Sequence, residues 1–171
     1  MSLTDLMSMA KPNLAAKDKI LQKIGDRALI NCFQCMRCTS GCTALKLLEL
    51  KPSEIEKLAS FGFVDELASS DIIWTCVTCL KCAQRCPQKA SPYHVIIALR
   101  NLAVEREAKV PEGFLKAVSQ ILETGLAEAL QKVVSRKMEA FDREGLGMPK
   151  VNLPRESFQA AFMKAMEEKI G

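Results

Sequence analysis

All eight cysteines of the chain fall into two runs that share one spacing. The spacing is Cys-x2-Cys-x2-Cys-x3-Cys, and the runs are Cys32, Cys35, Cys38 and Cys42, then Cys76, Cys79, Cys82 and Cys86. Proteins that hold two [4Fe–4S] clusters use this spacing, and the fourth cysteine of each run binds the cluster of the other run. Two complete runs with no cysteine left over therefore predict an electron-transfer protein.

We call this exchange of the fourth cysteines crosswise ligation. It predicts which four cysteines hold each cluster. One cluster is expected on Cys32, Cys35, Cys38 and Cys86, and the other on Cys76, Cys79, Cys82 and Cys42. Every corner of each cluster then carries a protein thiolate, so no iron is left open for a substrate. The clusters are expected to conduct electrons, and no catalytic residue is expected in this chain.

Structural zinc and disulfides are the alternative uses of these cysteines. Zinc sites favour Cys-x2-Cys pairs with longer gaps, which the third cysteine of each loop and the Cys86-Pro87 ending disfavour. Residues 1–14 contain no apolar signal-peptide core, and the run Val95–Leu99 is far too short to span a bilayer. We therefore expect a cytoplasmic protein without a transmembrane segment, in a compartment that keeps thiols reduced.

The charge of the chain does not favour nucleic acid as a partner. The formal net charge is +4 with neutral cysteines, and each oxidised cluster with its four thiolates contributes about −2. The apparent basicity therefore largely disappears when both clusters bind. The chain also has no glycine-rich dinucleotide fingerprint and no phosphate-binding loop, so it is not expected to bind flavin or nicotinamide by itself.

Four cations lie in or beside the cysteine loops, namely Arg37, Lys81, Arg85 and Lys89. Positive charge there favours reduced clusters and steers an anionic partner. Ordinary solvated surface charge is the alternative for each of them.

Apolar residues recur at helical spacing through most of the chain, whereas alternating β-branched residues are scarce. The predicted fold is mostly α, an α-helical ferredoxin core with additional C-terminal helices. The 33 residues between the runs support this, because they read as helical segments. We divide the chain into an N-terminal extension (1–29), a dicluster domain (30–110) and a C-terminal helical region that docks on a partner (111–171). Expected helices lie near residues 14–24, 44–50, 52–62, 64–68, 92–103, 114–123, 126–141 and 157–169.

The sequence resembles the C-type component of heterodisulfide reductase over about residues 30–149. The resemblance rests on Asn31-Cys-Phe-Gln-Cys-Met-Arg-Cys-Thr-Ser-Gly-Cys42, on Lys51-Pro52 and Phe61-Gly-Phe63, and on Ser70-Asp-Ile-Ile-Trp-Thr-Cys-Val-Thr-Cys-Leu-Lys-Cys-Ala-Gln-Arg-Cys-Pro87. Thr43 stands where members of that family often have proline.

The resemblance implies a subunit of an oxidoreductase complex that acts on sulfur groups. Such a subunit relays electrons between a flavin-containing, iron–sulfur A-type subunit and a B-type subunit with CCG motifs, where a disulfide is cleaved. This chain contains no Cys-Cys-Gly sequence, in keeping with catalysis in a neighbouring subunit. The alternative is a dicluster subunit of another flavin dehydrogenase complex, of the glycolate or anaerobic glycerol-phosphate type.

Overall fold

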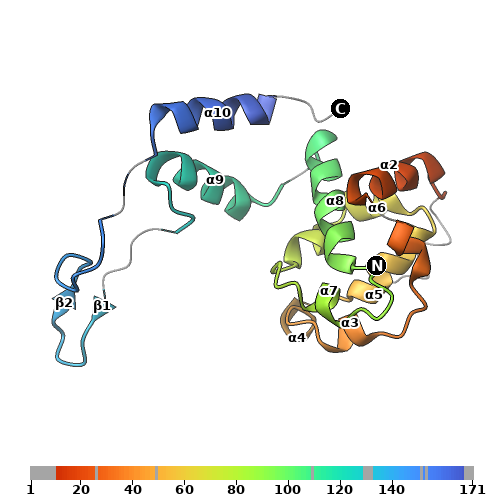
Figure 1. Cartoon of the computed structure of the whole chain (residues 1–171), viewed down its shortest axis with the longest axis horizontal. Helices are drawn as coiled ribbons and strands as arrows, with labels where there is room; N and C mark the ends of the chain where they lie inside the picture. Colours follow the sequence, from red (N-terminus) through yellow and green to blue (C-terminus); the bar gives the residue numbers. More distant parts are fainter. Residues whose placement is uncertain are drawn as a thin grey trace. The chain divides into compact units, whose positions relative to one another are not determined.

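The computed structural model of the chain is shown in Figure 1. It describes residues 11–25, 27–48, 50–108, 110–128, 133–150, 152 and 154–167. The chain divides into two compact units, Met1–Lys109 and Val110–Gly171. The described residues are mostly helical, which confirms the predicted mostly α fold class with further helices after the core. Among the helices in these ranges, none has the length and apolar character needed to cross a membrane.

The core of the first unit forms around α8 (Pro92–Glu105). The three helices with the most contacts to it are α2 (Leu14–Ile24), α5 (Pro52–Ser60) and α6 (Val64–Ala68). The apolar stripe of α8 that its sequence predicts is buried, and Val95, Ile96 and Leu99 are fully enclosed. Because each such side chain contributes roughly 1.5–3 kcal/mol on burial, this stripe holds the other three helices to α8.

Local sequence signals mark where these elements begin and end. The Asn13 side chain accepts a hydrogen bond from the backbone N–H of Ala16 (3.0 Å) at the start of α2, and Gly25 ends that helix with a left-handed φ of 66°. The 3-10 helix η2 (Asp71–Thr75) is capped by Ser70, which accepts from the N–H of Ile72 at 3.2 Å.

Short elements carry the two cysteine runs. The 3-10 helices η1 (Arg27–Asn31) and η2 lead into the runs, and each run contains a single helical turn, α3 (Arg37–Ser40) or α7 (Lys81–Arg85). These two turns pack on each other, while α3 also contacts α5 and α7 also contacts α8. A buried contact joins α3 to α5, since Thr39 Oγ1 lies 2.6 Å from Ser53 Oγ and accepts from the Ser53 N–H at 3.0 Å. The runs are thereby brought together against the helical core.

The second unit contains α9 (Glu112–Thr124), α10 (Glu156–Glu167) and a hairpin of β1 (Val133–Val134) and β2 (Ala140–Phe141). The two amphipathic helices agree with the expected ones, and Gln159 Nε2 donates to the Leu122 carbonyl at 2.8 Å. Where the structure describes burial in this unit, over residues 110–128, 133–150, 152 and 154–165, no residue is buried.

The prediction of a helix over residues 126–141 is wrong. Residues 129–132 lie outside the described ranges, and β1 pairs antiparallel with β2, with Val133 opposite Phe141. The apolar spacing is compatible with a helix, but β-branched residues favour a strand. Ser135 also forms a local turn, in which its hydroxyl accepts from the N–H groups of Lys137 and Glu139 at 3.2 Å each. The left-handed φ of 66° at Met138 is incompatible with a continuous helix.

Candidate functional site

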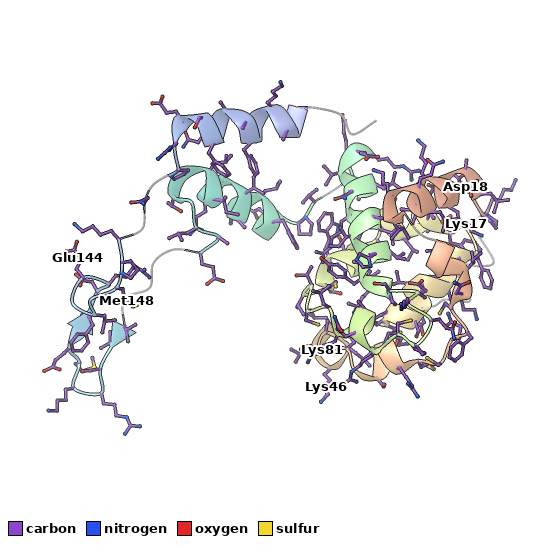
Figure 2. All side chains as sticks on the ribbon, in the orientation of Figure 1. Lys17, Asp18, Lys46, Lys81, Glu144 and Met148 are labelled. Atoms are coloured by element: carbon purple, nitrogen blue, oxygen red, sulfur yellow. The ribbon has the colours of Figure 1, made fainter. Side chains whose placement is uncertain are left out.

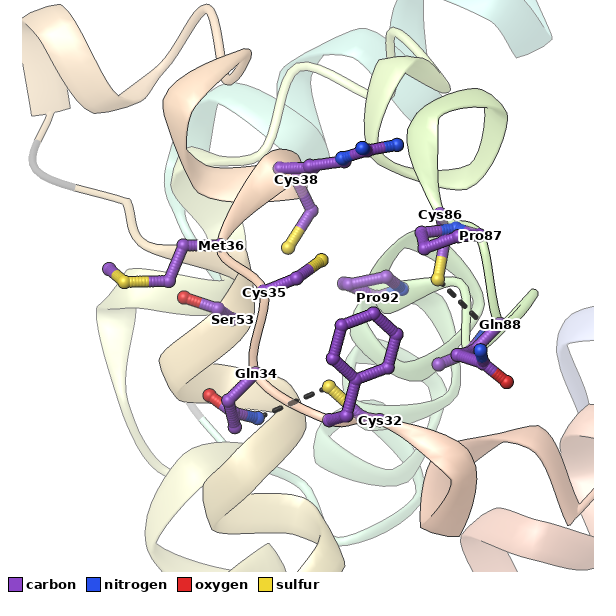
Figure 3. Close-up of a pocket in the computed structure, with 13 residues that line it drawn as sticks. Cys32, Gln34, Cys35, Met36, Cys38, Ser53, Cys86, Pro87, Gln88 and Pro92 are labelled. Carbon is purple, nitrogen blue, oxygen red and sulfur yellow. Dashed lines mark hydrogen bonds between the residues drawn. The ribbon is translucent and has the colours of Figure 1, made fainter.

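A first pocket gathers three cysteines of the first run with the last cysteine of the second run. Figure 3 shows the thiols pointing toward one another across the pocket, from the 32–38 loop on one side and the Cys86-Pro87 turn on the other. Its cysteines are Cys32, Cys35, Cys38 and Cys86, of which Cys38 is buried and Cys35 is exposed. Ser53 of α5 and Pro92 of α8 also line it, so the helical core supports this pocket directly.

A second pocket contains the complementary set. Its cysteines are Cys76, Cys79 and Cys82 of the second run and Cys42 of the first run. Cys79 is the exposed member, at the same place in its run as Cys35 in the other. The structure thus brings together the same two sets of four residues that crosswise ligation predicts. Four thiols around a hollow suit a cubane cluster, which needs one thiolate at each iron; ligation itself stays a prediction.

The two cysteine loops share an unusual backbone conformation. Gln34 and Met36 have φ of 58° and 60°, and their counterparts Thr78 and Leu80 have φ of 52° and 61°. Left-handed conformations cost roughly 1–3 kcal/mol in residues other than glycine and persist where the surroundings require them. Left-handed residues joined to a helical turn can direct successive N–H groups into one concavity, which suits an anionic group. Sequence reasoning missed this, because these positions carry no glycine or asparagine.

Hydrogen bonds and charge act on individual thiols. Gln34 Nε2 donates to Cys32 Sγ at 3.2 Å, and the Ala90 N–H donates to Cys86 Sγ at 3.1 Å. Hydrogen bonds of this kind stabilise a thiolate and help set the potential of a bound cluster. Burial raises the pKa of Cys32 and Cys38, and it raises the pKa of Cys82 to about 11. These three thiols are therefore less readily ionised until a metal group replaces the proton.

Cys79 behaves in the opposite way. The backbone N–H of Lys81 lowers its pKa most, and the Thr43 hydroxyl and the Lys81 charge lower it further. Lys81 Nζ also donates to Thr43 Oγ1 at 3.1 Å. Thr43, the residue that departs from the family pattern, therefore joins the end of the first run to the second pocket.

Arg100 of α8 fixes the start of the second run. Its Nε donates to the Ile73 carbonyl at 2.9 Å and its Nη2 donates to the Cys76 carbonyl at 2.6 Å. Its guanidinium also lies 5.4 Å from the centre of the Trp74 ring, within cation–π range. The buried Arg100 thus holds η2 and Cys76 to the helical core, a role that a lone arginine in a helical stripe does not reveal in sequence.

Glu56 of α5 is a second functional candidate that sequence reasoning missed. It is fully buried, and neither carboxyl oxygen has a hydrogen-bond partner among the described residues. Burial, and to a smaller extent the charge of Cys86, raises its pKa from 4.5 to about 9. Glu56 therefore enters the fold as a neutral acid at pH 7.

This burial predicts that stability falls as the pH rises. In the unfolded chain Glu56 ionises above its ordinary pKa of 4.5, whereas in the folded protein it keeps its proton up to about pH 9. The folded state thus binds more protons within this window, and from pH 5 to pH 7 the group reduces the free energy of unfolding by about 3 kcal/mol. In urea unfolding of the cluster-loaded protein under anaerobic conditions, Glu56→Gln should remove this part of the pH dependence.

Glu54→Gln is the matched control, because Glu54 lies on the same helix, is only half-buried and pairs with Lys51 at the surface. It should keep the pH dependence of the wild type. An identical pH slope for the wild type and Glu56→Gln would contradict the buried neutral acid.

A helical unit with two four-thiol pockets defines the class of dicluster iron–sulfur proteins. In agreement, residues 28–90 match a family model described as "4Fe-4S dicluster domain". The chain is also 32% identical over 149 residues to the C-type component of the H(2):CoB-CoM heterodisulfide,ferredoxin reductase of Methanothermobacter thermautotrophicus, an alignment that covers 86% of this chain and 75% of the relative. Its similarity to the C-type component of the ferredoxin:CoB-CoM heterodisulfide reductase of Methanosarcina mazei is 31% identity over 71% of this chain and 73% of that one.

A third relative, the C-type iron–sulfur component of the CoB–CoM heterodisulfide reductase of Methanopyrus kandleri, is 35% identical over 44% of this chain and 39% of its own length. The chain belongs to the family of C-type heterodisulfide reductase components. It is an iron–sulfur electron-transfer subunit of an oxidoreductase complex.

Proposed function

We propose that the chain binds two [4Fe–4S] clusters and relays electrons between a flavin-containing A-type subunit and a disulfide-active B-type subunit of a heterodisulfide reductase or a related complex. The observation that carries this proposal is the exchange of the last cysteines between the two pockets. Four thiols in each pocket match the four iron corners of a cubane, and this chain then offers no open metal position to a substrate.

Within this proposal the residues of the chain have separate tasks. The eight cysteine thiolates hold the clusters, which supply one-electron chemistry when bound. Gln34 and the Ala90 N–H stabilise negative charge in the first pocket, and Thr43 and Lys81 do so in the second. Because α3 and α7 pack on each other, the two pockets are parts of one interlocked unit.

The second unit supports a place in a larger assembly. Two amphipathic helices expose apolar side chains such as Leu115 and Met163, and no residue described in this unit is buried. A segment with so little core of its own gains most from burial against another protein. We propose that this unit docks on a partner subunit and that the complex is cytoplasmic, where thiols remain reduced.

Metal analysis tests the cofactor. The full chain, loaded with iron and sulfide under anaerobic conditions, should contain roughly eight irons and roughly eight inorganic sulfides. Stoichiometric zinc without sulfide in the protein from its native host would overturn the redox function.

Co-purification tests the partners. A tagged full chain recovered from its native host should bring down an A-type flavin subunit and a B-type CCG subunit. A flavin dehydrogenase of the glycolate or glycerol-phosphate type as the stable partner would instead establish the alternative complex.

A further inference from the structure

We infer that a surface beside the second pocket docks an acidic face of one partner subunit in the complex, an inference that rests on the proposed function. This surface, the α4 face, is built by α4 (Leu45–Leu48) and the second cysteine loop. It consists of Lys46, Leu47, Leu48, Val77, Leu80 and Lys81.

The α4 face is apolar at its centre. The helix α4 buries none of its residues, and Leu47 is 81% exposed. Val77 and Leu80 of the neighbouring loop are also exposed, although both line the second pocket. Ala44, the residue before α4, lines the same pocket, so helix and loop adjoin one another there. Exposed leucines and valine gathered at one site indicate a protein contact rather than a solvated surface.

The α4 face also lies where the second pocket is most accessible. Cys79 is exposed and lies in sequence between Val77 and Leu80, whereas Cys42, Cys76 and Cys82 are half-buried. A partner that covers these side chains approaches the metal site at its most exposed thiol. The face is therefore suited to electron exchange as well as to binding.

The charge of the two cysteine-bearing segments favours an acidic partner. Residues 27–48 and 72–104 contain no acidic residue, and the nearest acids along the chain are Asp26, Glu49, Asp71 and Glu105. The same two stretches contain seven cations, namely Arg27, Arg37, Lys46, Lys81, Arg85, Lys89 and Arg100. Two oxidised clusters contribute about −4 in total, so these segments keep a positive balance with both clusters bound.

Complementary potentials steer association and like charges oppose it. An acidic partner surface is therefore attracted to Lys46 and Lys81, whereas a second copy of this chain would bring like charges together. The first pocket exposes Phe33 and Met36, but the helix that follows Cys86 is α8, whose apolar stripe is buried, unlike that of α4. The α4 face is thus the more extensive exposed apolar surface, compared with the surface beside the first pocket.

Charge reversal in the full, cluster-loaded chain tests the α4 face. The probe is the remainder of the native complex, released from this subunit, and the readout is its Kd for each variant. Lys46→Glu and Leu47→Asp should each weaken binding at least tenfold. The loss for Lys46→Glu should shrink in 0.5 M salt, which screens charge, and the loss for Leu47→Asp should persist.

Lys19→Glu and Leu14→Asp on α2 are the matched controls and should change Kd less than twofold, because both side chains are exposed in the same unit. Figure 2 shows Lys46 and Lys81 at one end of this unit and the α2 residue Lys17 at the other. Iron content should equal that of the wild type in all four variants. Carbodiimide, which joins amines directly to carboxylates, should link Lys46 to an aspartate or glutamate of the partner.

Three results would overturn the docking surface. They are wild-type affinity in both α4 variants, a carbodiimide link from Lys46 to a second copy of this chain, and affinity losses in the α2 controls as large as in the α4 variants. Each of these three results can be obtained only if the wild-type chain, loaded with its clusters, binds the rest of the complex. If the wild type holds no clusters or does not bind, the proposed function itself fails, so the two failures are distinguishable.

Discussion

Replacing Cys42 by alanine should remove the cluster of the second pocket and leave the first pocket loaded. Cys42 belongs to the first run in sequence, but it lines the second pocket with Cys76, Cys79 and Cys82. Without its thiolate one iron corner has no protein ligand, and the cluster is no longer held. The reconstituted variant should contain roughly four irons and four sulfides in place of roughly eight of each.

Paired variants identify which cluster is lost. Cys42→Ala combined with Cys79→Ala should still retain roughly four irons, because both changes affect the same pocket. Cys42→Ala combined with Cys35→Ala should retain almost none, because each change affects a different pocket. The reverse pattern would mean that each run holds its own cluster, and it would contradict crosswise ligation. Iron and sulfide analysis, with electron paramagnetic resonance of the reduced protein, is sufficient to decide.

Replacing Arg100 by methionine should have the second largest effect. The change leaves the carbonyls of Ile73 and Cys76 without their charged donor and removes the guanidinium from the Trp74 ring. Hydrogen bonds to charged groups contribute roughly 1.5–3 kcal/mol each, and unsatisfied buried carbonyls are costly. We expect a loss of about 3 kcal/mol in the free energy of unfolding and faster release of iron from the second pocket.

Arg106→Met is the matched control for Arg100→Met. Arg106 follows the same helix and pairs with Asp65, but the two side chains are 39% and 42% exposed. Exposed ion pairs contribute less than about 1 kcal/mol, so this variant should resemble the wild type in urea unfolding and in iron release to a chelator. Equal behaviour of the two variants would show that Arg100 does not anchor Cys76.

The elements that follow from local sequence are those whose signals agree with one another. α8 combines Pro92 at its first turn with an apolar stripe at helical spacing, and this stripe is buried as expected. α6 spans the predicted residues 64–68, and α5 begins at the predicted Pro52. Where helix propensity, the capping residues and the apolar spacing all favour a helix, the segment is predictable from its own residues.

Features that depend on distant residues could not be found in this way. Residues 126–141 have apolar spacing compatible with a helix, but Val133 and Val134 pair with Ala140 and Phe141 in a hairpin. Glu56 resembles an ordinary surface acid in sequence, because its burial results from how α5 packs against α8, α6, α3 and η1. The partners of Arg100 are carbonyls 27 and 24 residues away along the chain, which no local pattern records.

The sequence by itself determined the chemistry of this protein. Eight cysteines in two matched runs predict thiolate ligation, because cluster spacing is a property of short segments. The spacing also predicts the crosswise sets, but only the tertiary structure decided how the two segments are held together: α3 packs on α7, with Cys86 in the first pocket and Cys42 in the second. It also decided which thiols are exposed and which charges surround them. Ligand type is a local property of the chain, whereas burial and electrostatics are sums over residues that folding brings together.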